Sequence, residues 1–376
     1  MEIIYIVIPA FEPEAGLYLR IRKMTERIPA QIIVIDDGSG RGYRKTFDQI
    51  EGTGYCTVLR HDKNRGKGRA LKTGFDHIRR QMAGQSGTVR YDKPAVRILC
   101  ADCDGQHLPD DGVRLLEKSR RHPGSLILGV RDFSGPEVPW KSRFGNWISS
   151  VVFRALSGIY LEDTQTGFRA FDGSLLELML RVPGERFEYE TSVLLVCAKQ
   201  DIPVRTEKIE TVYEEKNAGT HFRPVKDSIR VMAALFHEPV KFILSSLFCA
   251  ALDLFLFWIF ETILRAGQFE RILAATAGAR LLSASVNFTI NRNWVFQSER
   301  IGEMRGCRRE ALSYFLLCIG IMAASAISVA VVSDLSGLEP ASVKIPCDIL
   351  LFFLSYQIQK NRIFRRHGKD GKGNGL

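Results

Sequence analysis

Two carboxylates separated by one residue follow a short apolar run in the first half of the chain. Asp102 and Asp104 come directly after Ile98-Leu99-Cys100-Ala101, and Gly105 and Gln106 follow. Where a strand passes into a loop, side chains two residues apart lie on the same side, so both carboxylates can face one point beyond the strand. Such hard oxygen donors suit Mg²⁺ or Mn²⁺, which proteins often bind through one or two carboxylates and substrate phosphates. An isolated Asp-x-Asp is more often a polar turn, so its meaning depends on the neighbouring motifs.

Two further apolar runs also end in polar groups. Strands buried on both faces are expected at Ile3–Ile8, Ile32–Ile35 and Val96–Leu99, with helical stretches such as Glu14–Glu26 between them. This alternation predicts an α/β fold with an open, mostly parallel sheet and flanking helices. Ligands of such sheets bind beyond the carboxyl ends of the strands. The carboxylates expected to gather there are those of Glu12, Asp36, Asp37, Asp102 and Asp104.

A loop that contains glycines and cations, His61–Ala70, precedes a predicted helix over about Leu71–Arg80. Glycines and cations at the start of a helix can hold a diphosphate. The loop matches neither the Walker A motif nor the dinucleotide-binding fingerprint. Because Gly-Lys turns are usually solvated loops, this segment indicates a diphosphate site only together with the carboxylates.

The composition divides the chain into two parts. The 376 residues carry a formal net charge of +10, but long apolar runs are confined to the part after about residue 240. Cations cluster beside those runs, which favours an anionic membrane surface over nucleic acid. The eight cysteines are scattered and no second pair completes a zinc site, so we expect free thiols in a reducing compartment. The first residues lack the features of a signal peptide, which predicts that the N-terminal part stays in the cytosol.

Four apolar runs predict four transmembrane helices, over Phe242–Phe260, Ile272–Ile290, Ala311–Val332 and Val343–Ile358. The connection between the second and third runs is rich in arginine, and so is the tail after the fourth. The positive-inside rule therefore places both in the cytoplasm together with the N-terminal domain, in an integral membrane protein. The predicted domains are a catalytic domain over 1–224, an amphipathic linker helix over 225–238, a four-helix membrane domain over 239–366 and a basic flexible tail over 367–376.

Charged residues interrupt the predicted spans, and part of the sequence is repeated. The charged residues are Asp253, Arg280, Lys344 and Asp348. Such residues are costly in a membrane unless they pair or face water. They could line a path for a lipid phosphate, but ion pairs that fix helix packing are the favoured interpretation. Asn287–Phe296 aligns with Ser355–Phe364, which predicts that the second and fourth helices end alike in a two-plus-two parallel repeat.

Taken together, the motifs of the first part resemble family 2 of the glycosyltransferases, in the polyprenyl-phosphate branch that includes dolichyl-phosphate mannose synthase. The motifs that carry the resemblance are Ile8-Pro9-Ala10-Phe11-Glu12, Asp36-Asp37-Gly38-Ser39, Asn64-Arg65-Gly66-Lys67-Gly68, Asp102-Cys103-Asp104-Gly105-Gln106-His107, Gly129-Val130-Arg131, Ser142-Arg143-Phe144-Gly145-Asn146 and Asp163-Thr164-Gln165-Thr166-Gly167-Phe168-Arg169. Many members have Tyr-Asn-Glu where this chain has Phe11-Glu12-Pro13. The later part, with its Asn-Phe and Trp-Val-Phe helix endings, resembles the GtrA family of four-helix membrane proteins, which are proposed to move lipid-linked sugars.

The resemblance implies a GT-A type sheet and a role for each motif. Donor-binding residues would be Pro9, Ala10, Glu12, Asp36, Asp37, Lys67 and Asp102. A metal ion, Mg²⁺ or Mn²⁺, would lie on Asp102, Asp104 and Gln106 and stabilise the charge on the leaving nucleoside diphosphate. The acceptor phosphate would be bound by Arg131, Arg143, Arg169 and Arg223, with Asp104, Arg131 and Arg143 as the catalytic set. For Arg169 and Arg223, a solvated surface cation is an equally good interpretation.

Two helical segments would lie beside this site. Trp140–Leu156 carries Phe144, Trp147 and Val151 on one face, which predicts an interfacial amphipathic helix near the lipid; a core helix is the alternative. Glu185–Glu190 opens a second helix, and its carboxylates either approach the sugar or cap the helix.

The sequence therefore predicts a membrane-bound, inverting glycosyltransferase that moves a hexose from a nucleotide sugar, of the GDP-mannose or UDP-glucose type, to a polyprenyl phosphate at the cytosolic leaflet. The acceptor phosphate is already anionic, so no general base is required. A processive polysaccharide synthase is the closest alternative, but the Gln-x-x-Arg-Trp motif of those enzymes does not occur in this sequence. A bifunctional protein whose membrane domain also flips the lipid-linked sugar is the second alternative. The expected partners are the nucleotide sugar, the lipid, the membrane and further copies of the chain in a homo-oligomer, but no nucleic acid.

Overall fold

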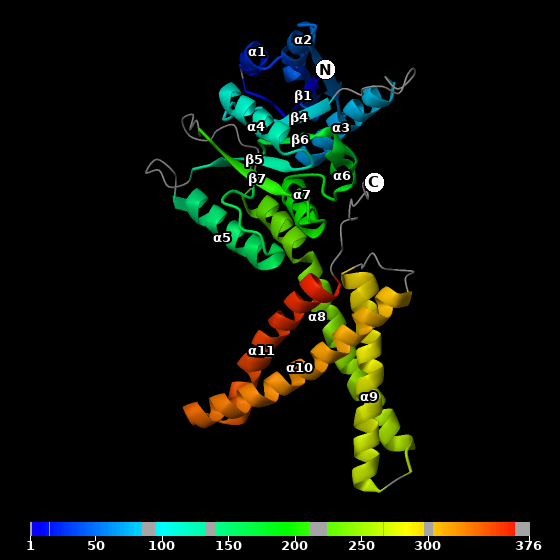
Figure 1. Cartoon of the computed structure of the whole chain (residues 1–376). Helices are drawn as coiled ribbons and strands as arrows, with labels where there is room; N and C mark the ends of the chain where they lie inside the picture. Colours follow the sequence, from blue (N-terminus) through cyan, green and yellow to red (C-terminus); the bar gives the residue numbers. More distant parts are fainter. Residues whose placement is uncertain are drawn as a thin grey trace, which may run out of the picture. The chain divides into compact units, whose positions relative to one another are not determined.

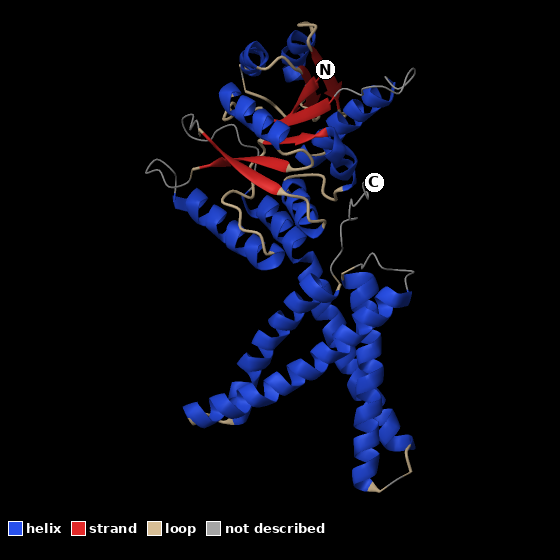
Figure 2. Ribbon diagram, in the orientation of Figure 1, coloured by secondary structure: helices blue, strands red, loops and turns tan. Residues whose placement is uncertain are grey.

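The computed structural model describes residues 2–14, 16–84, 95–132, 140–210, 224–265, 267–296 and 304–364. The chain divides into two compact units, residues 1–235 and 236–376. The first unit combines strands and helices, whereas the described residues of the second form helices (Figure 2).

A seven-stranded sheet forms the centre of the first unit (Figure 1). The strands are β1 (Glu2–Ala10), β2 (Gln31–Asp36), β3 (Cys56–Arg60), β4 (Ala95–Cys100), β5 (Leu126–Arg131), β6 (Arg169–Asp172) and β7 (Val204–Ile209). Their order is β3-β2-β1-β4-β6-β5-β7, and β6 runs antiparallel to its neighbours β4 and β5 while the other pairs are parallel. The strands predicted from the sequence lie within β1, β2 and β4, so the predicted mostly parallel sheet is confirmed.

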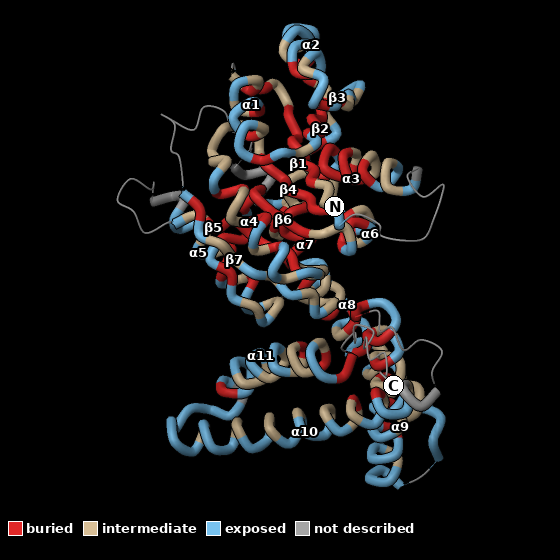
Figure 3. Tube along the Cα trace, turned by 45° about the horizontal axis from the view of Figure 1, so that its top comes forward, coloured by how far each residue is buried: buried red, intermediate tan, exposed pale blue. Residues whose placement is uncertain are grey.

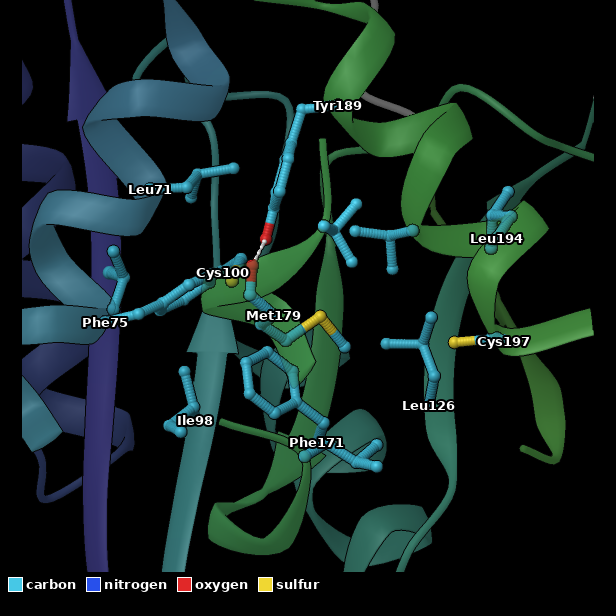
Figure 4. Close-up of a cluster of buried hydrophobic side chains, with 14 of the residues drawn as sticks. Leu71, Phe75, Ile98, Cys100, Leu126, Phe171, Met179, Tyr189, Leu194 and Cys197 are labelled. Carbon is cyan, nitrogen blue, oxygen red and sulfur yellow. Dashed lines mark hydrogen bonds between the residues drawn. The ribbon is translucent and has the colours of Figure 1, made fainter. Parts of the chain in front are cut away.

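Helices cover both faces of this sheet. They are α1 (Leu17–Arg27), α2 (Arg44–Glu51), α3 (Lys67–Gly84), α4 (Pro109–Arg121), α5 (Trp140–Ser157), α6 (Leu176–Arg181) and α7 (Glu188–Lys199), with 3₁₀ turns η1 (Arg41–Tyr43) and η2 (Gly173–Leu175). Tyr5 of β1 packs with α3, α6 and α7, and the next residue, Ile6, packs on the other face with α1, α2 and α4. In the first of these cores, the Tyr189 hydroxyl donates a 2.7 Å hydrogen bond to the Met179 carbonyl oxygen (Figure 4). Burial on both faces explains why β1, β2 and β4 are nearly continuous apolar runs.

The second unit is built from long helices whose residues are mostly exposed or intermediate in burial (Figure 3). They are α8 (Pro224–Ile263), α9 (Gln268–Ile290), α10 (Met304–Ser336) and α11 (Pro340–Ile358), with π-helical turns η4 (Asn291–Val295) and η5 (Gln359–Ile363) after α9 and α11. Each predicted span lies within one of these helices, and the predicted linker over 225–238 is the first part of α8. Among the described residues, two stretches are long and apolar enough to cross a membrane, Ile229–Ile263 and Cys307–Ser336.

The two halves of the second unit are related by a two-fold pattern of contacts. Among the described residues, the eight buried side chains of its main core cluster form four pairs at matching positions: Phe242 and Tyr314, Phe288 and Tyr356, Val295 and Ile363, Phe296 and Phe364. The ring centroids of Phe242 and Tyr356 lie 5.2 Å apart, and those of the matching pair, Tyr314 and Phe288, lie 5.5 Å apart. The sequence repeat is therefore also a repeat of packing.

Two contacts join residues that occupy matching positions in the two halves. In a two-fold arrangement, a contact between matching residues must lie on the symmetry axis. Phe296 and Phe364 stack with their centroids 5.4 Å apart. The Asn291 side-chain amide donates a 3.0 Å hydrogen bond to the Gln359 side-chain oxygen. These last two residues open η4 and η5, so the same π-helical turn brings both halves to the axis.

Ion pairs also cross between the halves. Arg292 Nε lies 2.7 Å from Glu310 Oε2, and Lys360 Nζ lies 3.2 Å from Glu238 Oε2. Each pair joins the π-helical turn of one half to the first long helix of the other, α10 or α8. Neither half can form these contacts alone.

We expect Glu310→Gln to destabilise the second unit more than Glu238→Gln does. The Arg292–Glu310 side chains are 10% and 1% exposed, whereas those of Lys360 and Glu238 are 19% and 22% exposed. Removing one partner of a buried ion pair costs about 3 kcal/mol, and the cost falls as water reaches the pair. Thermal unfolding in detergent measures both losses. Recovery of stability in the double variant Arg292→Met/Glu310→Leu would support this reason, and equal losses from the two single variants would contradict it.

The charged residues within the predicted spans pair with one another. Arg280 Nη2 lies 3.4 Å from Asp253 Oδ2, and Lys344 Nζ lies 3.0 Å from Asp348 Oδ2. The first pair joins α9 to α8, as expected of an ion pair that fixes helix packing, whereas the second lies within α11 and its side chains are 59% and 45% exposed.

Candidate active site

Four of the predicted donor-binding residues lie at the carboxyl ends of β1 and β2: Pro9, Ala10, Glu12 and Asp36. Pro9 and Ala10 are the buried last residues of β1, and Ala10 lies opposite Asp36 in the parallel register. The Ser39 amide donates to Asp36 Oδ1 at 2.8 Å, and the Glu12 amide donates to Ser39 Oγ, also at 2.8 Å. Ser39 therefore links the residue Glu12, which follows β1, to Asp36 at the end of β2.

The Asp37 carboxylate binds the loop that leads into α3. Its oxygens accept hydrogen bonds from the amides of Arg65 and Gly66 at 2.9 and 2.7 Å, and His61 Nδ1 lies 2.7 Å from Oδ1. Gly66 has a φ of 106°, a conformation that favours glycine. Asp37 is buried, and its hydrogen bonds position the glycine- and lysine-containing loop.

Lys67, the first residue of α3, joins two carboxylates. Its Nζ lies 2.6 Å from Asp102 Oδ1 and 2.8 Å from Glu190 Oε1 at the start of α7. Burial by itself would lower the pKa of Lys67, but these carboxylates outweigh that effect and raise the pKa well above its ordinary value. The Lys67 side chain therefore stays protonated and positively charged beside the acidic loop.

Asp102 and Asp104 differ in how well their charges are balanced. Burial raises the pKa of Asp102, but Lys67 more than compensates and the net pKa is lowered. Burial and the neighbouring Asp102 raise the pKa of Asp104 to about 6. Asp104 Oδ1 accepts a 3.1 Å hydrogen bond from the Gln106 amide.

The chemistry of this donor set fits a divalent cation. Within the described ranges, no three His, Cys, Asp or Glu side chains form a preformed metal cluster. The loop nevertheless presents two carboxylates and one carboxamide, which are hard oxygen ligands. A cation on Asp104 would offset the unfavourable negative charge that raises its pKa.

His107 supports the acidic loop from within. The Asp102 amide donates to His107 Nδ1 at 3.1 Å, and the imidazole stacks on the Phe168 ring with centroids 4.3 Å apart. Burial lowers the pKa of His107 to about 4 despite the nearby Asp102. The ring is thus neutral at physiological pH, with Nδ1 as acceptor, and it orients the Asp102 backbone.

Gly167 lets the chain approach the ion pair of Asp102 and Lys67 closely. A Cβ atom at this position would lie 2.6 Å from both Asp102 Oδ1 and Lys67 Nζ. Side-chain contacts this short do not occur, so only glycine fits without movement of the charged groups.

Arg131 is fixed beside the carboxylates. Its Nε and Nη2 donate to the two oxygens of the fully buried Asp163 at 2.8 and 3.2 Å. Its charge also helps to lower the pKa values of Asp102 and Asp104. A bidentate arginine of this kind has a fixed orientation.

The other predicted acceptor arginines have different surroundings. Arg169 is buried in β6, where it donates 2.8 Å hydrogen bonds to the carbonyl oxygens of Thr166 and Glu190. The solvated-cation interpretation is therefore wrong for Arg169, which supports the site from inside. Arg143 is exposed on α5, and Arg223 lies outside the described residues.

Three residues of the site were not among the predicted set. His107 and Gly167 lie inside the motifs but carry no ligand-like signal, because one acts through a backbone contact and the other through the absence of a side chain. Glu190 belongs to the acidic segment at the start of α7, where spacing alone does not separate a helix cap from a site residue. Only its 2.8 Å contact with Lys67 assigns it.

Comparisons with known proteins found a matching family model for part of each unit. Residues 5–175 match the Glycosyl transferase family 2 model, and residues 241–364 match the model of the GtrA/DPMS transmembrane domain. A UDP-N-acetylglucosamine–dolichyl-phosphate N-acetylglucosaminyltransferase from Methanococcus voltae is 25% identical over 231 residues, which cover 57% of this chain and 87% of that protein. A polyprenol monophosphomannose synthase from Mycolicibacterium smegmatis is 27% identical over 178 residues, 46% of this chain and 62% of that protein.

The comparison with solved structures also found a match. It is the glucosyl-3-phosphoglycerate synthase from Mycobacterium tuberculosis in complex with Mn²⁺, uridine diphosphate and phosphoglyceric acid. The two chains are 18% identical, with a TM-score of 0.44 over 63% of this chain and 78% of that one.

Proposed function

The chain belongs to glycosyltransferase family 2 and carries a GtrA/DPMS transmembrane domain, and from this premise we propose that it transfers a hexose from a nucleotide sugar to a polyprenyl phosphate at the cytosolic leaflet. It is a membrane glycosyltransferase. The curated relatives act on dolichyl phosphate and on a polyprenol, which supports a polyprenyl phosphate as acceptor. The donor is of the GDP-mannose or UDP-glucose type.

The observation that carries this proposal is the group of charges beyond β1, β2 and β4. Asp102 and Asp104, with Gln106, would hold Mg²⁺ or Mn²⁺, which when bound supplies positive charge to the leaving nucleoside diphosphate. Glu12 and Asp36 lie where a base and ribose would bind, at the ends of adjacent strands. Lys67 supplies a fixed cation beside them.

The acceptor would approach through α5 and the arginines. Phe144 and Trp147 are 53% and 59% exposed and stack on each other with centroids 6.0 Å apart. A row of exposed aromatic side chains on one helix face suits the interface of a membrane. Arg143 on the same helix and Arg131 would bind the acceptor phosphate, whose anionic oxygen attacks the anomeric carbon directly and inverts it. No proton has to be removed in this step.

The proposed topology follows from the placement of cations. Arg292 and Lys360, at the ends of α9 and α11, belong to basic segments, which favour the cytoplasmic side. The catalytic domain over 1–224 and the C-terminal tail would then face the cytosol, where nucleotide sugars are made. The ion pairs within the helices favour packing over a lipid pathway, so no separate transport activity is proposed.

The experiment is transfer of radiolabelled sugar from a panel of nucleotide sugars into organic-extractable lipid. Membranes that contain the full-length protein are supplied with polyprenyl phosphate, with and without EDTA. We expect label in the lipid only when a divalent cation is present and only with one class of donor. Label in a long water-soluble polymer would instead favour a processive synthase, and transfer unaffected by EDTA would contradict the metal site.

A further inference from the structure

The ammonium group of Lys67 lies between two carboxylates. It contacts Asp102 at 2.6 Å and Glu190 at 2.8 Å, and the Phe187 ring centroid lies 5.9 Å away. The side chains of Lys67 and Glu190 are only 15% and 7% exposed. This lysine therefore already supplies a counter-charge to a carboxylate that the proposed function gives to a metal ion.

Lys67 and a divalent cation would compete for the same carboxylate. Asp102 Oδ1 is the atom that Lys67 contacts, and charges of like sign repel strongly in a site from which water is largely excluded. A cation that arrives alone must therefore either displace Lys67 or bind next to it. Both are unfavourable while Lys67 has no anion besides Glu190 to take the place of Asp102.

The donor diphosphate provides such an anion. Lys67 begins α3, and the helix start and its glycine-containing loop suit a phosphate group. Glu190 lies outside the predicted metal set and can keep its contact when Lys67 leaves Asp102. The lysine thus has one permanent partner and one that it can exchange.

We propose that Lys67 is an exchangeable counter-ion, which neutralises Asp102 in the empty site and turns to the donor diphosphate when nucleotide and divalent cation bind together. This inference rests on the proposed function. It makes the binding of the two ligands mutually dependent, because each removes an obstacle to the other. Such coupling is reciprocal, so the nucleotide must strengthen metal binding by the same factor as the metal strengthens nucleotide binding.

The test measures Mn²⁺ binding by the full-length protein in detergent. The electron paramagnetic resonance signal of the free ion reports how much Mn²⁺ remains unbound. We expect Lys67→Met, which keeps most of the side-chain volume but removes the charge, to bind Mn²⁺ about 10-fold more tightly than wild type without nucleotide, within the usual range of site coupling. Added UDP or GDP should then strengthen Mn²⁺ binding strongly in wild type and little in the variant. Sugar transfer by the variant should fall although its metal affinity rises.

Lys72→Met is the matched control. Lys72 is a buried lysine one turn later in α3, and its Nζ donates a 2.8 Å hydrogen bond to the Gly184 carbonyl oxygen, away from Asp102. It should leave the affinity for Mn²⁺ within about twofold of wild type, because it removes an equal charge that does not contact the acidic loop.

Asp104→Asn separates failure of this inference from failure of the proposed function. If Asp104→Asn weakens Mn²⁺ binding but Lys67→Met does not tighten it, the counter-ion role is overturned and the metal site stands. If Asp104→Asn binds Mn²⁺ like wild type, or if wild type binds none even with nucleotide, the metal site fails and the inference fails with it.

Discussion

Asp104→Asn should reduce sugar transfer by about 1,000-fold while the protein still folds and inserts into the membrane. The substitution keeps the shape of the side chain but removes a charge that a divalent cation would need. Asp104 is the acidic-loop carboxylate whose charge is poorly balanced, as its pKa of about 6 indicates. Losing this charge should not weaken the folded state, since burial and Asp102 already disfavour it. Initial rates of lipid labelling measure the effect at saturating Mg²⁺ and Mn²⁺.

Asp110→Asn is the control for this experiment. Asp110 is an exposed carboxylate at the start of α4 that pairs with Arg27 at 2.5 Å. Its loss should change transfer by less than about twofold, because exposed ion pairs contribute little. Full activity of Asp104→Asn with an unchanged metal requirement would remove the central assumption of the mechanism.

Gly167→Ala should reduce transfer by about 100-fold, the usual effect of displacing catalytic groups by roughly 1 Å. The added methyl group would occupy the space beside Asp102 Oδ1 and Lys67 Nζ, 2.6 Å from each. At least one of them must move, which disrupts the position of the acidic loop. Transfer rates and the Mn²⁺ affinity should therefore change together.

Gly42→Ala provides the matched comparison. A Cβ atom at Gly42 meets nothing within 4 Å, so the same chemical change is made in open space. Near-normal transfer by Gly42→Ala and by Gly167→Ala alike, with equal melting temperatures, would show that the close approach at Gly167 has no catalytic importance.

The parallel part of the sheet could be predicted from the sequence, whereas its antiparallel strand could not. β1, β2 and β4 are buried on both faces, so each is an apolar run that stands out from its surroundings. β6 is only four residues long, begins with the buried Arg169 and follows a polar loop. Its pairing with β4 depends on long-range contacts that no local pattern reveals.

The residue types of the candidate site were predictable, but their partners were not. Asp102 and Asp104 follow from their spacing at a strand end, taken together with the neighbouring motifs. Lys67 was expected to bind phosphate, and the structure adds that it contacts Asp102 and Glu190 across separate elements. Glu190 lies far along the chain from Asp102, so only the fold brings them together.

The helical unit shows how a repeat can be visible in sequence while its packing is not. Asn291 and Gln359 differ in type and size, yet they occupy matching positions and bond to each other across the axis. The alignment of the two helix ends predicted that they would look alike. It could not predict that the matching residues would meet, because two similar helix ends can equally lie far apart.

The contacts across this axis set an order of events during synthesis. The first hairpin, α8 and α9, leaves the ribosome with Glu238 and Asn291 already made, but their partners Lys360 and Gln359 come only at the end of α11. Until then the hairpin is held by apolar packing and by its own polar contacts, such as the 2.7 Å hydrogen bond from Ser245 to Asn291 and the ion pair of Arg280 and Asp253. The turn after α11 is thus the closing element of the unit. A chain interrupted before that turn keeps an open helix bundle, the kind of defect that quality-control proteases remove.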